Sequence, residues 1–215
     1  MINTSNITID NEDWRYYAEK VRAKKYEIEE VEVKKYFKLE NIVEAVFDTA
    51  NKLYGLRFVL TSLKAYHDDA KIYEVYQGEG NDLIAIFIHD NYSRMYKSSG
   101  AWMSELRKQS FYSADGSKTI PIVLNNNNFA KGESATLLSF DDCRTLFHEF
   151  GHGLHGMLSD VKYEYLASTS VLRDFVELPS QLMEHWYHYY HHYHHYHYHH
   201  YHYHCHHYHR HHHYH

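Results

Sequence analysis

Two histidines and a glutamate lie within five residues of one another, in a pattern that could bind a metal ion and use it. They are His148, Glu149 and His152, inside the stretch FDDCRTLFHEFGHGLHGMLSD of residues 140–160. On a helix of about 3.6 residues per turn, residues four apart point the same way, so the two imidazoles could bind one zinc ion. Glu149 lies about 100° around such a helix and could take a proton from a water molecule at that ion. The pattern indicates a zinc hydrolase, although a pair of ordinary core histidines would also fit it.

A catalytic zinc ion usually needs a third protein ligand besides an open position for water. Glu177 is the best candidate, because the stretch VLRDFVELPSQ follows after a turn long enough to bring a second helix back. An exposed helix carboxylate is the alternative for this residue. Asp174 stands three residues earlier on the same helix face and could accept a hydrogen bond from a ligand imidazole. His155 shares the face of the motif histidines, and we assign it a structural or supporting role.

Two helices must position these residues. Ser139 is a suitable N-cap for a helix over 140–158. A further helix is expected over 171–186, and Pro179 predicts a kink near 175–179, because proline removes the hydrogen bond to the carbonyl four residues back.

Two more helices are expected near the start of the chain, at 13–30 and 39–55, because their apolar residues recur at three- and four-residue spacing. Gly55 stands where the second of these helices would stop.

Strands are indicated at 71–77 and 83–89, where β-branched and aromatic residues flank Gly-Glu-Gly-Asn-Asp and predict a β-hairpin. A third strand is expected at 121–125, with loops at 97–100 and 114–118. The expected fold is therefore mainly α with a small antiparallel β-sheet. The hairpin could offer an edge to an extended peptide, but packing is the simpler purpose.

Composition excludes several classes of partner. The net charge is −6 and the basic residues form no stripe, which argues against nucleic acid. The longest strongly apolar run, LIAIFI at 83–88, is too short to span a bilayer, and the first residues do not resemble a signal peptide. Cys143 and Cys205 suggest no disulfide framework. We therefore expect a soluble, cytoplasmic chain without membrane partners; its oligomeric state is open, with a monomer favoured.

The motif segments also resemble a known family. The stretch TLFHEFGHGLHGML followed by RDFVELPSQLMEHW is similar to the thimet oligopeptidase and oligopeptidase A family of zinc metallopeptidases, and within it to the dipeptidyl carboxypeptidases. The similarity extends upstream through DWRYYAEKVR, IYEVY, GAWMSELRKQS and the N-x-x-N-F of 125–129, so it covers about residues 13–186.

The resemblance implies a zincin-like catalytic core that holds one Zn²⁺ per chain. In that family the two histidines of the motif and the later glutamate bind zinc, roles that fall here on His148, His152 and Glu177. The family's general base falls on Glu149, and the implied substrates are short peptides hydrolysed through zinc-activated water. The 24 residues between His152 and Glu177 match the family pattern.

Residues 187–215 depart from that pattern, because 17 of these 29 residues are His and 10 are Tyr. Family members are several hundred residues long, and their downstream helices supply the His and Tyr residues that stabilise the oxyanion. We therefore expect a truncated catalytic domain at 1–186 and a low-complexity, poorly packed tail at 187–215. The tail could bind metals loosely, but we favour its origin in repetitive DNA read after a truncation or frame change. The competing function is a catalytically inactive metal-binding fragment with a His-rich tail.

Overall fold

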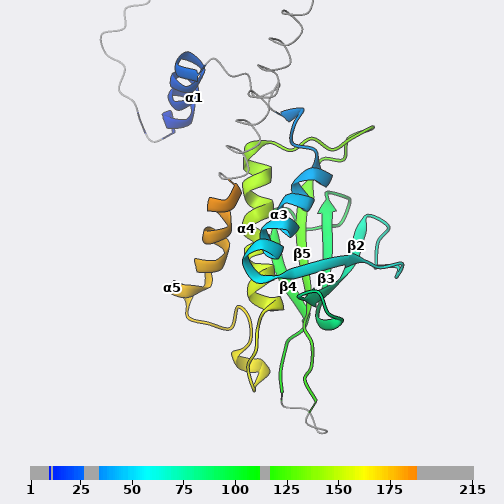
Figure 1. Ribbon diagram of the computed structural model, residues 1–215. Helices are drawn as coiled ribbons and strands as arrows, with labels where there is room; N and C mark the ends of the chain where they lie inside the picture. Colours follow the sequence, from blue (N-terminus) through cyan, green and yellow to red (C-terminus); the bar gives the residue numbers. More distant parts are fainter. Residues whose placement is uncertain (1–9, 11, 27–33, 112–116, 188–215) are drawn as a thin grey trace, which may run out of the picture.

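The computed structural model describes residues 10, 12–26, 34–111 and 117–187. Its main body has two layers, a five-stranded sheet and two long helices (Figure 1). The described helices are α1 (Trp14–Tyr26), α3 (Leu39–Tyr54), α4 (Phe140–Met157) and α5 (Arg173–Val176), with a short 3-10 turn at Glu164–Leu166. The strands are β1 (Leu56–Leu60), β2 (Ala70–Gln77), β3 (Asp82–Tyr92), β4 (Trp102–Arg107) and β5 (Ile122–Phe129).

The sheet has the strand order β1-β2-β3-β5-β4 and is mixed rather than antiparallel. The predicted hairpin is confirmed as β2 and β3, and the third predicted strand is confirmed as β5. However, β5 pairs parallel to β3, because the chain crosses from β3 to β4 at the edge and returns between them. The expectation of a mainly α fold with a small antiparallel sheet is therefore only partly right.

Two strands were not predicted from the sequence. Strand β1 begins directly after Gly55, so no run of loop-forming residues separates it from α3 in the sequence. Strand β4, WMSELR, carries charged residues because it lies at the edge of the sheet, where its side chains are only half-buried or exposed.

Helix α3 agrees with its prediction. It ends at Gly55, which adopts a left-handed conformation with φ of 67° and whose N–H reaches the carbonyls of Ala50 and Asn51. Ile42, Val46 and Ala50 are buried along one face of the helix. That face covers the sheet, as its contacts with β1 show.

Helix α4 also begins where the sequence predicts. The Ser139 side chain accepts a hydrogen bond from the Asp142 N–H, and the Asp142 carboxylate accepts one from the Ser139 N–H, a reciprocal capping box. One face of α4 is buried against β5, β4 and β3. At Gly153 an added Cβ would lie 3.1 Å from the Asn125 side chain, so the missing side chain lets the helix approach β5 closely.

Aromatic rings join the two layers. The Phe87 ring of β3 lies 6.2 Å from Phe47 of α3 and 5.6 Å from Phe150 of α4, measured between centroids, and it meets both rings nearly edge to face. Phe58 of β1 stacks on Phe47 at 4.2 Å. Such pairs contribute about 0.5–1.5 kcal/mol each beyond the area that they bury. This cluster holds α3 and α4 on the same face of the sheet.

The last helical segment is interrupted as Pro179 predicts. Helix α5 ends at Val176, Glu177 forms a turn, and residues 178–187 are helical again. Tyr187 is buried, and its ring lies 5.9 Å from that of Phe147.

Several predictions reach beyond the described residues. The continuation of α1 through 27–30, part of the 114–118 loop, and residues 188–215 of the tail all lie outside them, so the division of the chain near residue 186 stays a prediction. The loop at 97–100 is confirmed. No helix in the described ranges is long and apolar enough to cross a membrane.

Candidate metal centre

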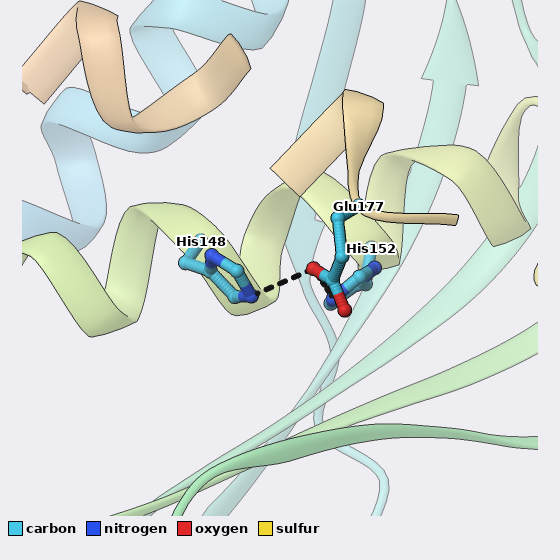
Figure 2. Close-up of side chains that lie close together, drawn as sticks. All are labelled: His148, His152 and Glu177. Atoms are coloured by element: carbon cyan, nitrogen blue, oxygen red, sulfur yellow. Dashed lines mark ion pairs between the residues drawn. The ribbon is translucent and has the colours of Figure 1, made fainter. Parts of the chain in front are cut away.

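Three side chains that are distant in sequence converge beside α4. The Nε2 atoms of His148 and His152 lie 3.3 and 3.2 Å from the same oxygen, Oε2 of Glu177 (Figure 2). The two histidines come from successive turns of α4, whereas Glu177 sits at the turn that follows α5. The candidate ligand atoms of the three residues all lie within 4.8 Å of one another. The structure thus brings together the three residues that the sequence nominates as metal ligands.

The spacing of these atoms fits a zinc ion. Donors about 2.0–2.2 Å from a tetrahedral zinc lie roughly 3.3 Å from one another. The two nitrogen-to-oxygen distances of 3.3 and 3.2 Å match that value. Two imidazole nitrogens and one carboxylate oxygen are also the ligand set of many hydrolytic zinc sites, in which the fourth position stays open.

His148 is oriented by a carboxylate that was not predicted. Its Nδ1 lies 2.7 Å from Oε1 of Glu184, so Nδ1–H donates to the carboxylate and the Nε2 lone pair faces Glu177. The assignment of this role to Asp174 is wrong. Asp174 is exposed, the Nδ1 atom of His148 pairs with Glu184, and the Nδ1 atom of His152 has no hydrogen-bond partner among the described residues. Glu184 stands seven residues after Glu177, two helical turns on, a spacing that could have identified it in the sequence.

Glu177 is held in place by Ser180. The Ser180 hydroxyl donates to Oε2 of Glu177 at 2.7 Å and lies 2.9 Å from the Glu177 carbonyl oxygen. The Ser180 hydroxyl is the largest cause that lowers the pKa of the Glu177 carboxyl, and the two neighbouring histidines lower it further. Glu177 is therefore ionised, as a carboxylate metal ligand must be, and it faces the two imidazoles.

Burial favours the neutral form of His152, which is the form that binds metals. Burial is the largest cause that lowers the pKa of His152. Burial also lowers the pKa of His155, whose ring packs against Phe175 with 6.2 Å between centroids. That contact agrees with the structural role assigned to His155, which does not belong to the three-residue group.

Glu149 lies on α4 near His148 and Glu177 and also contacts strand β4 of the sheet. It is 7% exposed, and burial raises the pKa of its carboxyl, an effect that His148 opposes and Glu177 reinforces. A hydrogen bond from the Met103 backbone of β4 also reaches this carboxylate and lowers its pKa. Glu149 therefore lies between the candidate metal centre and the edge strand, where it can act on a proton without serving as a ligand.

Known proteins are similar to this chain in sequence. "Dipeptidyl carboxypeptidase" of Escherichia coli (strain K12) is 44% identical over 179 residues, which are 81% of this chain and 25% of that protein. The protein of the same name from Salmonella typhimurium is 42% identical over 184 residues, or 83% of this chain and 26% of the relative. "Oligopeptidase A" of Escherichia coli (strain K12) is 37% identical over 179 residues, again 81% of this chain and 26% of the relative.

The chain thus spans about a quarter of the length of these curated relatives. The family model described as Peptidase family M3 matches residues 5–213, which is nearly the whole sequence. This match confirms the resemblance carried by the motif segments. The grouping of His148, His152 and Glu177 in the structure agrees with this family match. The chain belongs to peptidase family M3.

Proposed function

We propose that this chain carries the zinc-binding catalytic core of a peptidase that hydrolyses short peptides. The observation that carries the proposal is the convergence of two Nε2 atoms on one Glu177 oxygen, with Glu149 on the adjacent side of the same helix. The printed names of the relatives, dipeptidyl carboxypeptidase and oligopeptidase A, support peptides as the substrate class. Release of dipeptides from the C-terminal end is the finer form of the proposal, because the first two relatives carry that name.

His148, His152 and Glu177 would hold the zinc ion. When bound, zinc supplies a Lewis acid that polarises a peptide carbonyl and lowers the pKa of water to near neutrality. Glu184 keeps the Nδ1 proton of His148 in place, and Ser180 keeps Oε2 of Glu177 directed at the histidines.

Glu149 would act as the general base. Its carboxylate takes a proton from the attacking water and can then give that proton to the amine of the leaving fragment. Its position on α4, one residue after His148, places it beside the ligands but outside their group. The hydrogen bond from the Met103 backbone orients the carboxylate relative to β4.

Strand β4 is the edge strand of the sheet that contacts Glu149, and a peptide could bind along it. It pairs with β5 on one side, and within the described residues no strand pairs with its other side. An extended peptide can add to such an edge through main-chain hydrogen bonds. The β2–β3 hairpin cannot serve this purpose, because β2 lies between β1 and β3, and β3 lies between β2 and β5. We therefore assign the peptide to the edge beside Glu149.

A second candidate function is metal binding without catalysis. The observation that favours it is the tail, in which 17 of 29 residues are His, side chains that bind zinc, copper and nickel. In this case the chain would bind metal ions but would cleave no peptide.

Hydrolysis of an N-blocked tetrapeptide separates the two functions. The full chain is incubated with zinc, and dipeptide release is followed by chromatography, with Glu149→Gln as the matched variant. Removing a general base costs about 100- to 10,000-fold in rate. Release that depends on Glu149 supports the peptidase. Equal release from both proteins rejects Glu149 as the general base and with it this proposal, and no release from either protein favours metal binding alone.

A further inference from the structure

We propose that Gly151 and Ser180 are positioning residues that set the place of the Glu177 carboxylate relative to the two histidines. The inference rests on the proposed zinc site and adds the two residues that position one of its ligands. Gly151 lies on α4 between the two motif histidines, and Ser180 lies on the helical segment 178–187 that returns to α4.

Helix α4 and the helical segment 178–187 approach each other closely at Gly151. A Cβ added there would lie 2.6 Å from the Pro179 carbonyl oxygen, 2.6 Å from the Ser180 Cα and 3.0 Å from the Pro179 carbonyl carbon. All three are backbone atoms, which cannot swing aside as the end of a flexible side chain can. Glycine within a helix costs about 1 kcal/mol relative to alanine. Here that cost is offset by a backbone contact that no other residue would allow.

Ser180 transmits this contact to the metal centre. It is fully buried, and its hydroxyl donates to Oε2 of Glu177 at 2.7 Å. The same oxygen lies 3.3 and 3.2 Å from the Nε2 atoms of His148 and His152. A continuous path therefore runs from the α4 backbone through Ser180 to the ligand oxygen. The contact at Gly151 sets how closely Glu177 approaches, and the hydroxyl sets which oxygen it presents.

The other two glycines of α4 face different neighbours. An added Cβ at Gly153 would meet only the Asn125 side chain, at 3.1 Å or more, and one at Gly156 would meet side chains of Met103, Val123 and Ser168. Gly153 therefore provides a matched control, because it has the same helical setting but packs against the sheet.

Zinc affinity of the full chain, measured by competition with a chelator, tests the proposal. Because the tail also carries histidines, the double variant His148→Ala/His152→Ala is measured as well. It gives the zinc binding that comes from the rest of the chain. Disturbing a residue that orients a ligand costs about 10- to 100-fold in metal affinity. We expect a loss of that size for Gly151→Ala and for Ser180→Ala. Gly153→Ala should stay within about threefold of the unchanged chain, and an equal loss there would overturn the proposal.

A double-mutant cycle distinguishes positioning from general stability. If Gly151 and Ser180 act through Glu177, their substitutions should change zinc affinity little in a Glu177→Ala background. Equal losses in both backgrounds would overturn the positioning role. Ser180→Ala introduces no clash, so it decides the question even if Gly151→Ala does not fold. Tight zinc binding by the unchanged chain, combined with equal losses in both backgrounds, would leave the proposed function standing while rejecting this inference.

Discussion

The Nδ1 atom of His148 lies 2.7 Å from Oε1 of Glu184, and this contact joins α4 to the helical segment 178–187. It fixes the tautomer of His148 so that the opposite ring nitrogen faces Glu177. The orientation of one proposed ligand therefore depends on a carboxylate that is not itself a ligand.

Replacing Glu184 should weaken zinc binding. In Glu184→Ala the His148 ring loses its hydrogen-bond acceptor, so zinc affinity should fall about 10- to 100-fold. Chelator competition measures the effect. Asp174→Ala is the control, because Asp174 is exposed and should leave the affinity unchanged. Equal affinities for Glu184→Ala and the unchanged chain would contradict the orienting role.

A buried ion cluster should contribute strongly to stability. Asp90 is fully buried, and its carboxylate accepts hydrogen bonds from Arg94, Lys97 and the Tyr66 hydroxyl. Lys97→Met removes one cation and leaves the carboxylate partly unpaired, which should cost about 3–5 kcal/mol of unfolding free energy in urea titrations.

The exposed Asp48–Lys52 pair is the matched control for this cluster. Its two atoms lie 2.7 Å apart, but the side chains are 44% and 65% exposed. Lys52→Met should therefore cost less than about 1 kcal/mol. Similar costs for the two lysine variants would show that the buried cluster is not a special source of stability.

Acid should destabilise the protein through His89. This residue is 2% exposed, and burial, aided by the charge of Lys71, lowers the pKa of its imidazole to about 3. The unfolded imidazole has a pKa near 6.5, so between these values the unfolded chain binds the extra proton. Stability is therefore complete above about pH 6.5 and falls by about 1.4 kcal/mol per pH unit as the pH drops toward the folded value.

Urea unfolding at several pH values between 4.5 and 6.5 measures this dependence. The variant His89→Phe removes the titrating group and should flatten the curve, while the other ionisable groups contribute equally to both proteins. An unchanged pH slope in His89→Phe would refute the assignment.

The left-handed cap of α3 should require glycine. Gly55 has φ of 67°, and an added Cβ would meet nothing closer than the Gln77 side-chain nitrogen at 3.6 Å. The cost of Gly55→Ala is therefore conformational, about 1–2 kcal/mol in thermal or urea unfolding. Gly80→Ala, where φ is not positive and the nearest atom is 4.0 Å away, should stay within about 0.5 kcal/mol. Comparable costs at both positions would contradict the role of the cap.

The sequence by itself determined the features that depend on neighbours along the chain. The pairing of His148 with His152 follows from helical periodicity, the start of α4 from the capping box at Ser139, and the end of α3 from Gly55. Each involves groups only a few residues apart, so residue types at short spacing are enough to predict it. The break before Pro179 belongs to the same class.

Apart from the approach of Glu177 to the motif histidines, which the sequence nominated, only the tertiary structure decided which distant segments meet. The parallel pairing of β3 with β5, the edge position of β4 and the contact of Gly151 with Pro179 and Ser180 join residues far apart in the chain. Glu184 is a further case, because its spacing of seven residues from Glu177 suggests a shared helix face but does not show that this face meets His148. These relationships depend on how whole elements pack, and local spacing carries no information about the distance or angle between two packed elements.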